Sequence, residues 1–237
     1  MIKHANTIQY VKINQQPVTK VFSSFVNIRG LELESSIGNA WVCLKDLSLP
    51  FLQILRTKAV PVNMLTGLIE RSGGYLTEVN LSHTYHEEVD NKRIIQAIYQ
   101  KCPNLKYLKL LFRKSSLLEL ENLLINCQNL NGLFIVVGEM IDWDDLFKVL
   151  AKSSPTSLFK FKFWFYFPIK LESLKLFFDS WKDRHPMLLQ TIPFNNVNME
   201  IYFDLVVKYK TKGVVEKYDN DHMRNFEDFE WVKKKIN

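Results

Sequence analysis

The sequence is poor in the residues that mark several classes of protein. Its 237 residues include only three cysteines, Cys43, Cys102 and Cys127, which cannot pair into a closed set of disulfides. Glycine and proline occur eight times each, which excludes collagen-like and low-complexity chains. Apolar residues make up 47% of the chain and include 17 phenylalanines, so a disordered chain is excluded too.

Signals for membranes and export are also missing. Lys160, Lys162 and Pro168 interrupt the most apolar stretch, Phe159–Ile169, which is therefore too broken to span a bilayer. Residues 1–10 are polar and mixed, whereas a signal peptide carries an apolar centre. We therefore expect a reduced intracellular protein, cytoplasmic or nuclear, without a membrane partner.

Motifs of catalysis and nucleotide binding are absent from the sequence. It contains no G-x-G-x-x-G, no G-x-x-x-x-G-K and no G-x-S-x-G. The two pairs of nearby carboxylates have structural explanations, because Asp144–Asp145 falls in the first turn of a predicted helix and Asp219–Asp221 in a polar turn. We predict a protein that is not an enzyme and has neither catalytic residues nor a cofactor.

Two groups of potential metal ligands are better explained by structure than by metal binding. His83, His86 and the two following glutamates form H-x-x-H-E-E, which matches no zinc-protease motif and is better explained as a solvated loop. Cys102 and Cys127 each lie three residues before a predicted strand, and no C-x-x-C occurs. Their matched positions favour a small buried slot at the end of a helix, so we predict no metal site.

What the sequence does contain is a repeated apolar spacing, L-x-x-L-x-L, which we call the strand motif. The clear copies are Leu76–Val79–Leu81, Leu105–Leu108–Leu110, Leu130–Leu133–Ile135 and Leu158–Phe161–Phe163. Further copies are Ile8–Val11–Ile13, Ile28–Leu31–Leu33, Leu49–Leu52–Ile54 and a weak Leu189–Ile192–Phe194. Most spacings lie close to the roughly 20–29 residues of leucine-rich repeats.

Amphipathic segments separate the copies. Helical spacing is clear near residues 63–72, 91–101, 117–124, 142–150, 171–184 and 199–212. Ser116 with Glu119 resembles a capping box, and Asp142 is placed to cap the next helix. Strand–helix units that cannot bury their apolar sides alone predict an α/β leucine-rich-repeat solenoid, a horseshoe with parallel concave strands and convex helices.

The regularity of the pattern varies along the chain. Spacings of 20 and 21 residues near the start leave little room for helices, so residues 1–45 are interpreted as an irregular N-terminal cap or degenerate repeats. Residues 46–198 are predicted to form the leucine-rich repeats. Residues 199–237 are interpreted as a C-terminal capping element and charged tail, because the exposed end of a solenoid must be made soluble.

The stretch Cys102–Leu110, echoed at Cys127–Leu130, resembles the cysteine-containing leucine-rich repeats of F-box proteins. In that family the repeats bind a protein that is to be ubiquitinated, and a separate F-box docks the Skp1-type adaptor of a cullin ligase. Residues 1–27 contain no Leu-Pro followed by an amphipathic three-helix pattern. We therefore expect adaptor binding only if an F-box lies upstream in a longer protein.

Strand periodicity indicates which residues face away from the leucines. In the fifth to seventh copies they are basic or aromatic, and we call the following eight the basic–aromatic patch. It comprises Tyr107, Lys109, Arg113, Phe134, Lys160, Lys162, Trp164 and Tyr166. Such mixtures suit protein recognition, although a self-packed sheet face explains them about equally well.

Three binding functions follow in order of preference. The first is a protein-recognition module, the substrate-binding part of an F-box-type (SCF) ubiquitin ligase receptor. The alternative is a stand-alone leucine-rich-repeat scaffold or inhibitor without a link to ubiquitin. Nucleic-acid binding ranks third, because the formal charge of +6 is modest and the lysines are spread along the chain.

Overall fold

The computed structural model describes residues 5–15, 21–35, 41–82, 87–194 and 200–220. Within these ranges, nine strands form one sheet in sequence order, and every neighbouring pair is parallel. The strands are β1 (Tyr10–Ile13), β2 (Gly30–Glu34), β3 (Ile54–Lys58), β4 (Glu78–Ser82), β5 (Tyr107–Phe112), β6 (Gly132–Val137), β7 (Lys160–Phe165), β8 (Met187–Pro193) and β9 (Val215–Asp219).

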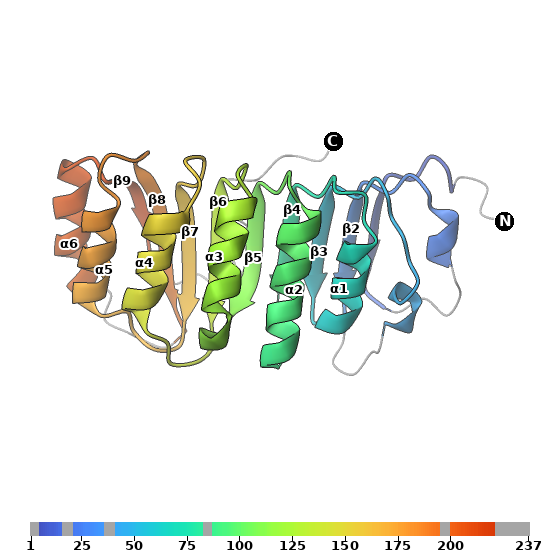
Figure 1. The fold of residues 1–237 in the computed structure, drawn as a ribbon, viewed down its shortest axis with the longest axis horizontal. Coiled ribbons are helices and arrows are strands. Elements are labelled where there is room, and N and C mark those ends of the chain that lie inside the picture. Colours follow the sequence, from blue (N-terminus) through green and yellow to red (C-terminus); the bar gives the residue numbers. More distant parts are fainter. Residues whose placement is uncertain (1–4, 16–20, 36–40, 83–86, 195–199, 221–237) are drawn as a thin grey trace.

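Helices connect the strands from β3 onward and lie side by side on one side of the sheet (Figure 1). They are α1 (Val62–Glu70), α2 (Glu88–Lys101), α3 (Leu117–Asn126), α4 (Trp143–Ser153), α5 (Leu171–Ser180) and α6 (Glu200–Thr211). The earlier connections hold the short 3₁₀ turns Val21–Ser24 and Val42–Leu44, as the short spacings near the start of the chain predict. The predicted α/β leucine-rich-repeat solenoid is confirmed by this order and direction of the strands.

The core is one continuous layer between the sheet and the helices, and it extends from Phe22 to Val215. The motif residues Leu105, Leu108 and Leu110 are at most 1% exposed, as are Leu130, Leu133 and Ile135. Each unit therefore buries its apolar side against its neighbours along the whole stack, which is how a solenoid is stabilised.

Backbone hydrogen bonds keep the units in register just before each strand. The carbonyl of Gln9 accepts the N–H groups of Arg29 and Gly30 at 2.7 and 2.9 Å, and the carbonyl of Arg29 does the same for Gln53 and Ile54. The pattern continues through the residues that precede β4, β5, β6 and β7. The first residue of each strand is thereby held at the same height in the stack.

Register corrects the strand motif in two copies. Leu55 pairs with Leu31 and lies in the core, whereas Ile54 pairs with Gly30 on the opposite face, so the third copy is Leu52–Leu55–Thr57. In β8, Leu189 pairs with Phe161, so it holds the second position of its copy and not the first. Both predicted copies lie three residues away from their true positions. The reason is that apolar residues also occupy positions on the side of the sheet opposite the core, where polar residues are expected.

The predicted capping box at Ser116 is wrong. The Ser116 hydroxyl makes no cap and donates to Asn91 Oδ1 of α2 at 2.6 Å. Glu119 accepts hydrogen bonds from Gln96 and Tyr99, also on α2, at 3.0 and 3.2 Å. Packing against the previous helix thus outweighs a local cap, whereas at α4 the predicted cap is confirmed, since Asp142 accepts from the N–H groups of Asp144 and Asp145.

The two cysteines of the repeated motif lie in equivalent places. Each follows the last residue of its helix, and its N–H donates to the carbonyl four residues earlier at 2.8 Å. Both side chains are 0% exposed, and burial raises the pKa of each thiol to about 12. Asn104 and Asn129, two residues after each cysteine, donate to carbonyls of the preceding unit, which explains the repeated Cys-x-Asn.

Candidate functional site

The side of the sheet opposite the helices, here called the sheet face, is the concave side of the solenoid. Parallel pairing aligns one residue from each strand across this face, and we call this set the central row. It consists of Lys12, Glu32, Arg56, Asn80, Lys109, Phe134, Lys162, Gln190 and Asp219. Its neighbours along each strand point into the core, so the alternation of the strands alone selects this row.

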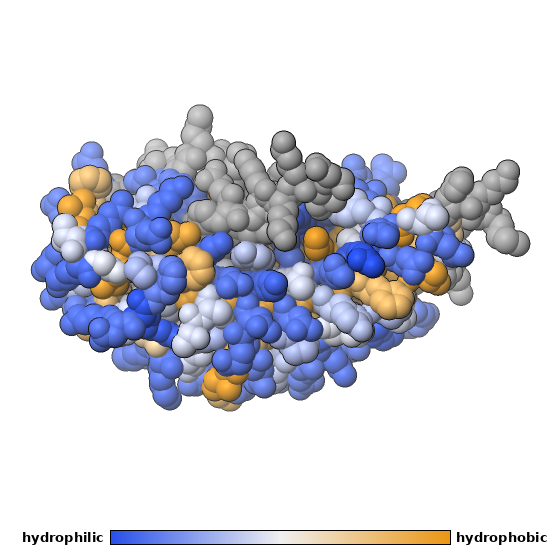
Figure 2. All heavy atoms as spheres, turned by 90° about the horizontal axis from the view of Figure 1, so that it is seen from above, coloured by the Kyte–Doolittle hydropathy of each residue, from blue (hydrophilic) through white to orange (hydrophobic). Residues whose placement is uncertain are grey.

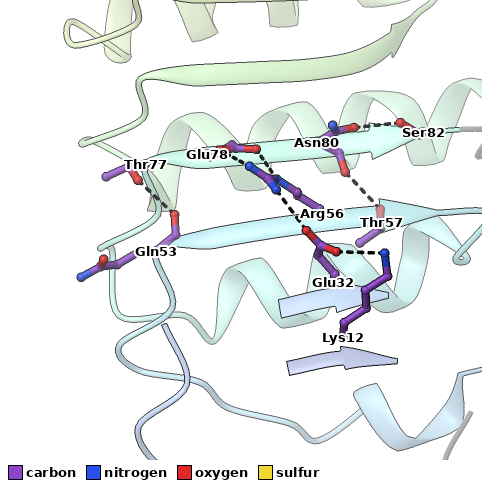
Figure 3. A network of polar contacts seen from close by, with 9 residues as sticks. All are labelled: Lys12, Glu32, Gln53, Arg56, Thr57, Thr77, Glu78, Asn80 and Ser82. Atoms are coloured by element: carbon purple, nitrogen blue, oxygen red, sulfur yellow. Dashed lines mark hydrogen bonds and ion pairs between the residues drawn. The ribbon is translucent and has the colours of Figure 1, made fainter. Parts of the chain in front are cut away.

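In β1 to β4 the charges of the sheet face pair with one another (Figure 3). Arg56 contacts Glu32 at 3.0 Å and Glu78 at 2.6 Å, and Lys12 contacts Glu32 at 3.4 Å. Two residues further along the same strands, Lys58 contacts Glu34 at 2.7 Å. Opposite charges on adjacent strands thus form a ladder of ion pairs, which we call the N-terminal ion network.

The network changes the titration of its acids. Burial alone would raise the pKa of Glu32, but hydrogen bonds from Tyr10 and Arg56 and the charges of Arg56 and Lys12 outweigh it and lower that pKa. The partly exposed Glu34 also has a lowered pKa, because Lys58 donates to it. Burial and the nearby Glu32 raise the pKa of the Tyr10 hydroxyl. Glu32 and Glu34 therefore stay ionised at neutral pH.

In β5 to β7 the central row has a different composition. Lys109 and Lys162 lie on either side of Phe134 in the register, with their ammonium nitrogens 4.6 and 5.0 Å from its ring centroid. These are cation–π distances. The three strands contain no aspartate or glutamate.

The neighbouring rows extend the basic and aromatic character. Lys160 lies over the ring of Tyr107 at 5.5 Å, and burial lowers the pKa of its ammonium group. On the other side of the central row, Trp164 packs edge-on against Tyr166 at 4.8 Å and Phe194 at 5.5 Å.

The structure brings together most of the basic–aromatic patch. Tyr107 and Lys160 share one row, Lys109, Phe134 and Lys162 share the next, and Trp164 lies one row further. Tyr166 follows the end of β7 and joins the Trp164 cluster. Arg113 lies at the margin after β5, where it is paired with Glu139 at 2.9 Å.

The predicted patch missed four residues of the same face, Gln190, Ile192, Phe194 and Asp219. Gln190 pairs with Lys162 in the register, and its amide donates to Asp219 of β9 at 3.1 Å. Gln190, Ile192 and Phe194 were missed because the predicted copy in β8 was misplaced by three residues. Asp219 was missed because β9 was not predicted. A usable signal was present, because Gln190 is the first polar residue in the apolar run that starts at Met187.

The remaining candidate residues concern metal binding and paired carboxylates. His83 and His86 lie outside the described residues, as does Asp221 of the second carboxylate pair. In the described ranges, no group of three or more histidine, cysteine or acidic side chains is arranged to hold a metal ion. No helix within those ranges is long and apolar enough to cross a membrane. Seen along the strands, the surface is mostly hydrophilic with scattered apolar residues (Figure 2).

Comparison with known proteins adds little beyond the fold. No family model matches the chain, and neither does any curated protein. Among solved structures, the chain is similar to the leucine-rich repeat-containing protein LegL7 from Legionella pneumophila, with 12% sequence identity and a TM-score of 0.44. The match covers 91% of this chain and 84% of LegL7. The fold assignment rests on strand order and register in the chain itself.

Proposed function

We propose that the sheet face over β5 to β8 is a protein-binding surface for a target that presents acidic and apolar groups. The observation that carries this proposal is Lys160 over the ring of Tyr107, beside the cluster of Trp164, Tyr166 and Phe194, all of which keep part of their exposure. A carboxylate from a partner would pair with Lys160, and apolar groups would pack on Trp164, Tyr166 and Phe194. Because the strands are held by ladders on both sides, little reorganisation opposes binding.

We further propose that this surface recognises substrates of an F-box-type ubiquitin ligase. The support is the repeated Cys-x-Asn ahead of β5 and β6, whose cysteines and asparagines have equivalent contacts in successive units. Purified chain should then capture a target whose ubiquitination depends on it, together with a Skp1-type adaptor when an F-box is fused or present upstream. Target capture without any adaptor-dependent ubiquitination would favour the stand-alone scaffold or inhibitor.

The placement of the surface is tested with a matched pair of variants. The patch variant carries Lys109→Ala, Lys160→Ala, Lys162→Ala and Trp164→Ala. The control carries Lys148→Ala, Lys152→Ala, Lys182→Ala and Leu118→Ala, and thus loses three lysines and one large apolar residue from the helix side, where these side chains are exposed.

Affinity capture from the native cell, followed by titration of each purified target, gives the result. We expect the control to keep its targets and the patch variant to lose at least about tenfold in affinity, since central interface residues dominate binding. Circular dichroism melting verifies that both variants are folded. Equal target affinity of the two folded variants would show that the surface lies elsewhere.

A further inference from the structure

The exposed part of the sheet face over β5 to β8 is divided into two zones. In the first, here called the basic zone, Lys160 lies over the ring of Tyr107 and both side chains keep part of their exposure. The second, the aromatic zone, is formed by Trp164, Tyr166 and Phe194 near the ends of β7 and β8. Between them lies the central row, whose members on β5 to β7 are at most 4% exposed. A partner therefore gains most of its contact area at the two zones.

The basic zone continues along the row that contains Lys160. Register places Leu188 and Lys217 beside it on β8 and β9, and Lys217 is exposed. Within the described ranges, no carboxylate forms an ion pair with Lys160. Burial lowers the pKa of the Lys160 ammonium group, so a carboxylate from a partner would stabilise its charged form. This zone therefore fits an acidic side chain.

The rings of the aromatic zone are packed against one another. The ring centroids of Tyr166 and Phe194 are 4.1 Å apart, and Trp164 packs edge-on against them at 4.8 and 5.5 Å. Because the rings touch, a partner must bind on their outer surface and not between them. Phe194 is the most exposed of the three, at 50%. An apolar or aromatic side chain of a partner would cover this surface.

Strand geometry fixes the separation of the two zones. Lys160 and Trp164 lie on the same face of β7, four residues apart, which corresponds to about 13 Å. In an extended partner segment, residues i and i+4 also point to the same side and lie about 13 Å apart. In a helix the same pair would be only about 6 Å apart, and a separation of about eight residues would be needed to reach both zones.

We propose that the partner binds as an extended segment along β7, with an acidic side chain on the basic zone and a large apolar side chain, four residues away, on the aromatic zone. This inference rests on the proposed function and adds the conformation and the side-chain spacing of the target. An extended segment has the same residue repeat as β7, so both contacts form without a bend. The partner residue midway between them faces the buried central row, where a small side chain suffices.

The spacing is tested by selection from a display library of random peptides of about twelve residues, which can hold either spacing. Peptides are selected on the full chain and counter-selected on the patch variant. We expect the enriched peptides to carry Asp or Glu four residues from a large apolar residue, in either order. A dominant separation of about eight residues, or no fixed separation, would overturn the proposal.

Two matched pairs of variants test which zone each peptide residue contacts. Lys160→Glu is matched by Lys148→Glu on α4, and Phe194→Ala is matched by Phe203→Ala on α6, since both control side chains are exposed. In fluorescence anisotropy titrations, each test variant should bind a selected peptide at least about tenfold more weakly than the parent, whereas both controls keep its affinity. Circular dichroism melting verifies that all four variants are folded.

An exchange of charge gives the sharper result. A peptide whose acid is replaced by lysine should bind Lys160→Glu more tightly than it binds the parent chain, because the ion pair is restored in reverse. Failure of this exchange would overturn the proposal, as would full affinity of either folded test variant for the original peptide.

The outcomes also separate this inference from the proposed function. If a natural target loses affinity for the patch variant but the selection yields no peptide that depends on the patch, the extended segment is wrong and the binding surface stands. The same holds if patch-dependent peptides lack the spacing of four residues. If neither a target nor a peptide depends on the patch, both proposals fail.

Discussion

The two halves of the sheet face have the same backbone but opposite arrangements of charge. In β1 to β4, acids and bases alternate between adjacent strands, and Arg56 bridges two glutamates. In β5 to β7, lysines flank a phenylalanine and the strands carry no acid. The first half pairs its charges within the sheet, whereas the lysines of the second half lie against aromatic rings. A repeat scaffold can thus carry different side-chain chemistry at its two ends.

The difference also shows in what holds each half together. Arg56 holds the N-terminal ion network by charge, and its side chain keeps 23% of its exposure to solvent. Phe134 holds the other half by apolar contact, since it is 1% exposed. A substitution at Arg56 should therefore act through lost charge pairing, and one at Phe134 through lost apolar burial.

The largest effect is expected at Phe134. Phe134→Ala removes a buried ring, so we expect the free energy of unfolding to fall by about 3–4 kcal/mol. Phe134→Leu keeps most of the apolar volume and should cost less than about 1.5 kcal/mol. Urea unfolding measures both variants. A loss below 1 kcal/mol for alanine, as a rough limit, would mean that the ring contributes little to the packing of this half.

Arg56→Ala should rank second. It leaves Glu32 and Glu78 close together without the cation between them, and we expect a loss of about 2 kcal/mol, reduced from the fully buried case by partial exposure. The triple variant Glu32→Gln, Arg56→Met, Glu78→Gln removes the repulsion as well and should recover part of the loss. If the triple variant is less stable than Arg56→Ala, the network contributes through specific geometry and not charge balance.

Acid should weaken the N-terminal half first. The pKa of Glu32 is lowered in the folded chain from an ordinary value of 4.5, so its contribution is complete above that value and is lost as the pH falls through the folded pKa. Hydrogen exchange at pH 6 and pH 3, corrected for intrinsic rates, should show β2 to β4 losing more protection than β6 and β7. An equal loss of protection in all strands would contradict a local origin. In Glu32→Gln, the difference in protection between the two groups of strands should become smaller.

The smallest effect is expected at the margin of the N-terminal ion network. Lys58 and Glu34 keep 44% and 40% of their side-chain exposure, so their ion pair resembles an ordinary surface pair. Lys58→Ala should change stability by less than about 0.5 kcal/mol, and added salt should remove even that. A larger, salt-resistant loss in urea unfolding would show that the network acts as one unit.

Much of this architecture could be predicted from residues alone. Leu105, Leu108 and Leu110 repeat at Leu130, Leu133 and Ile135, and a spacing of this kind has few structural solutions other than stacked strands. The residues between them on each strand must then face the other way, which is why Lys109, Phe134 and Lys162 were predicted to share a face. Asp142 acts through its own helix, so its role as a cap was also predictable.

Errors arose where a contact depends on distant parts of the chain. The copies at Leu49 and Leu189 were misplaced because apolar residues also occupy facing positions there, and only pairing with Leu31 and Phe161 decides the register. Ser116 has the spacing of a cap, yet its hydroxyl bonds to Asn91 of the previous helix. Strand β9 carries a weak apolar pattern and is recognised by its pairing with β8.

The sequence by itself determined the kind of fold and the face on which the basic and aromatic residues gather, because both follow from periodicities within short segments. The tertiary structure alone decided which charges meet and which rings lie beneath lysines. Those contacts join residues more than twenty positions apart, and their partners depend on strand register, which no local pattern specifies. The ion pairs of Arg56 and the flanking of Phe134 by Lys109 and Lys162 are contacts of this kind.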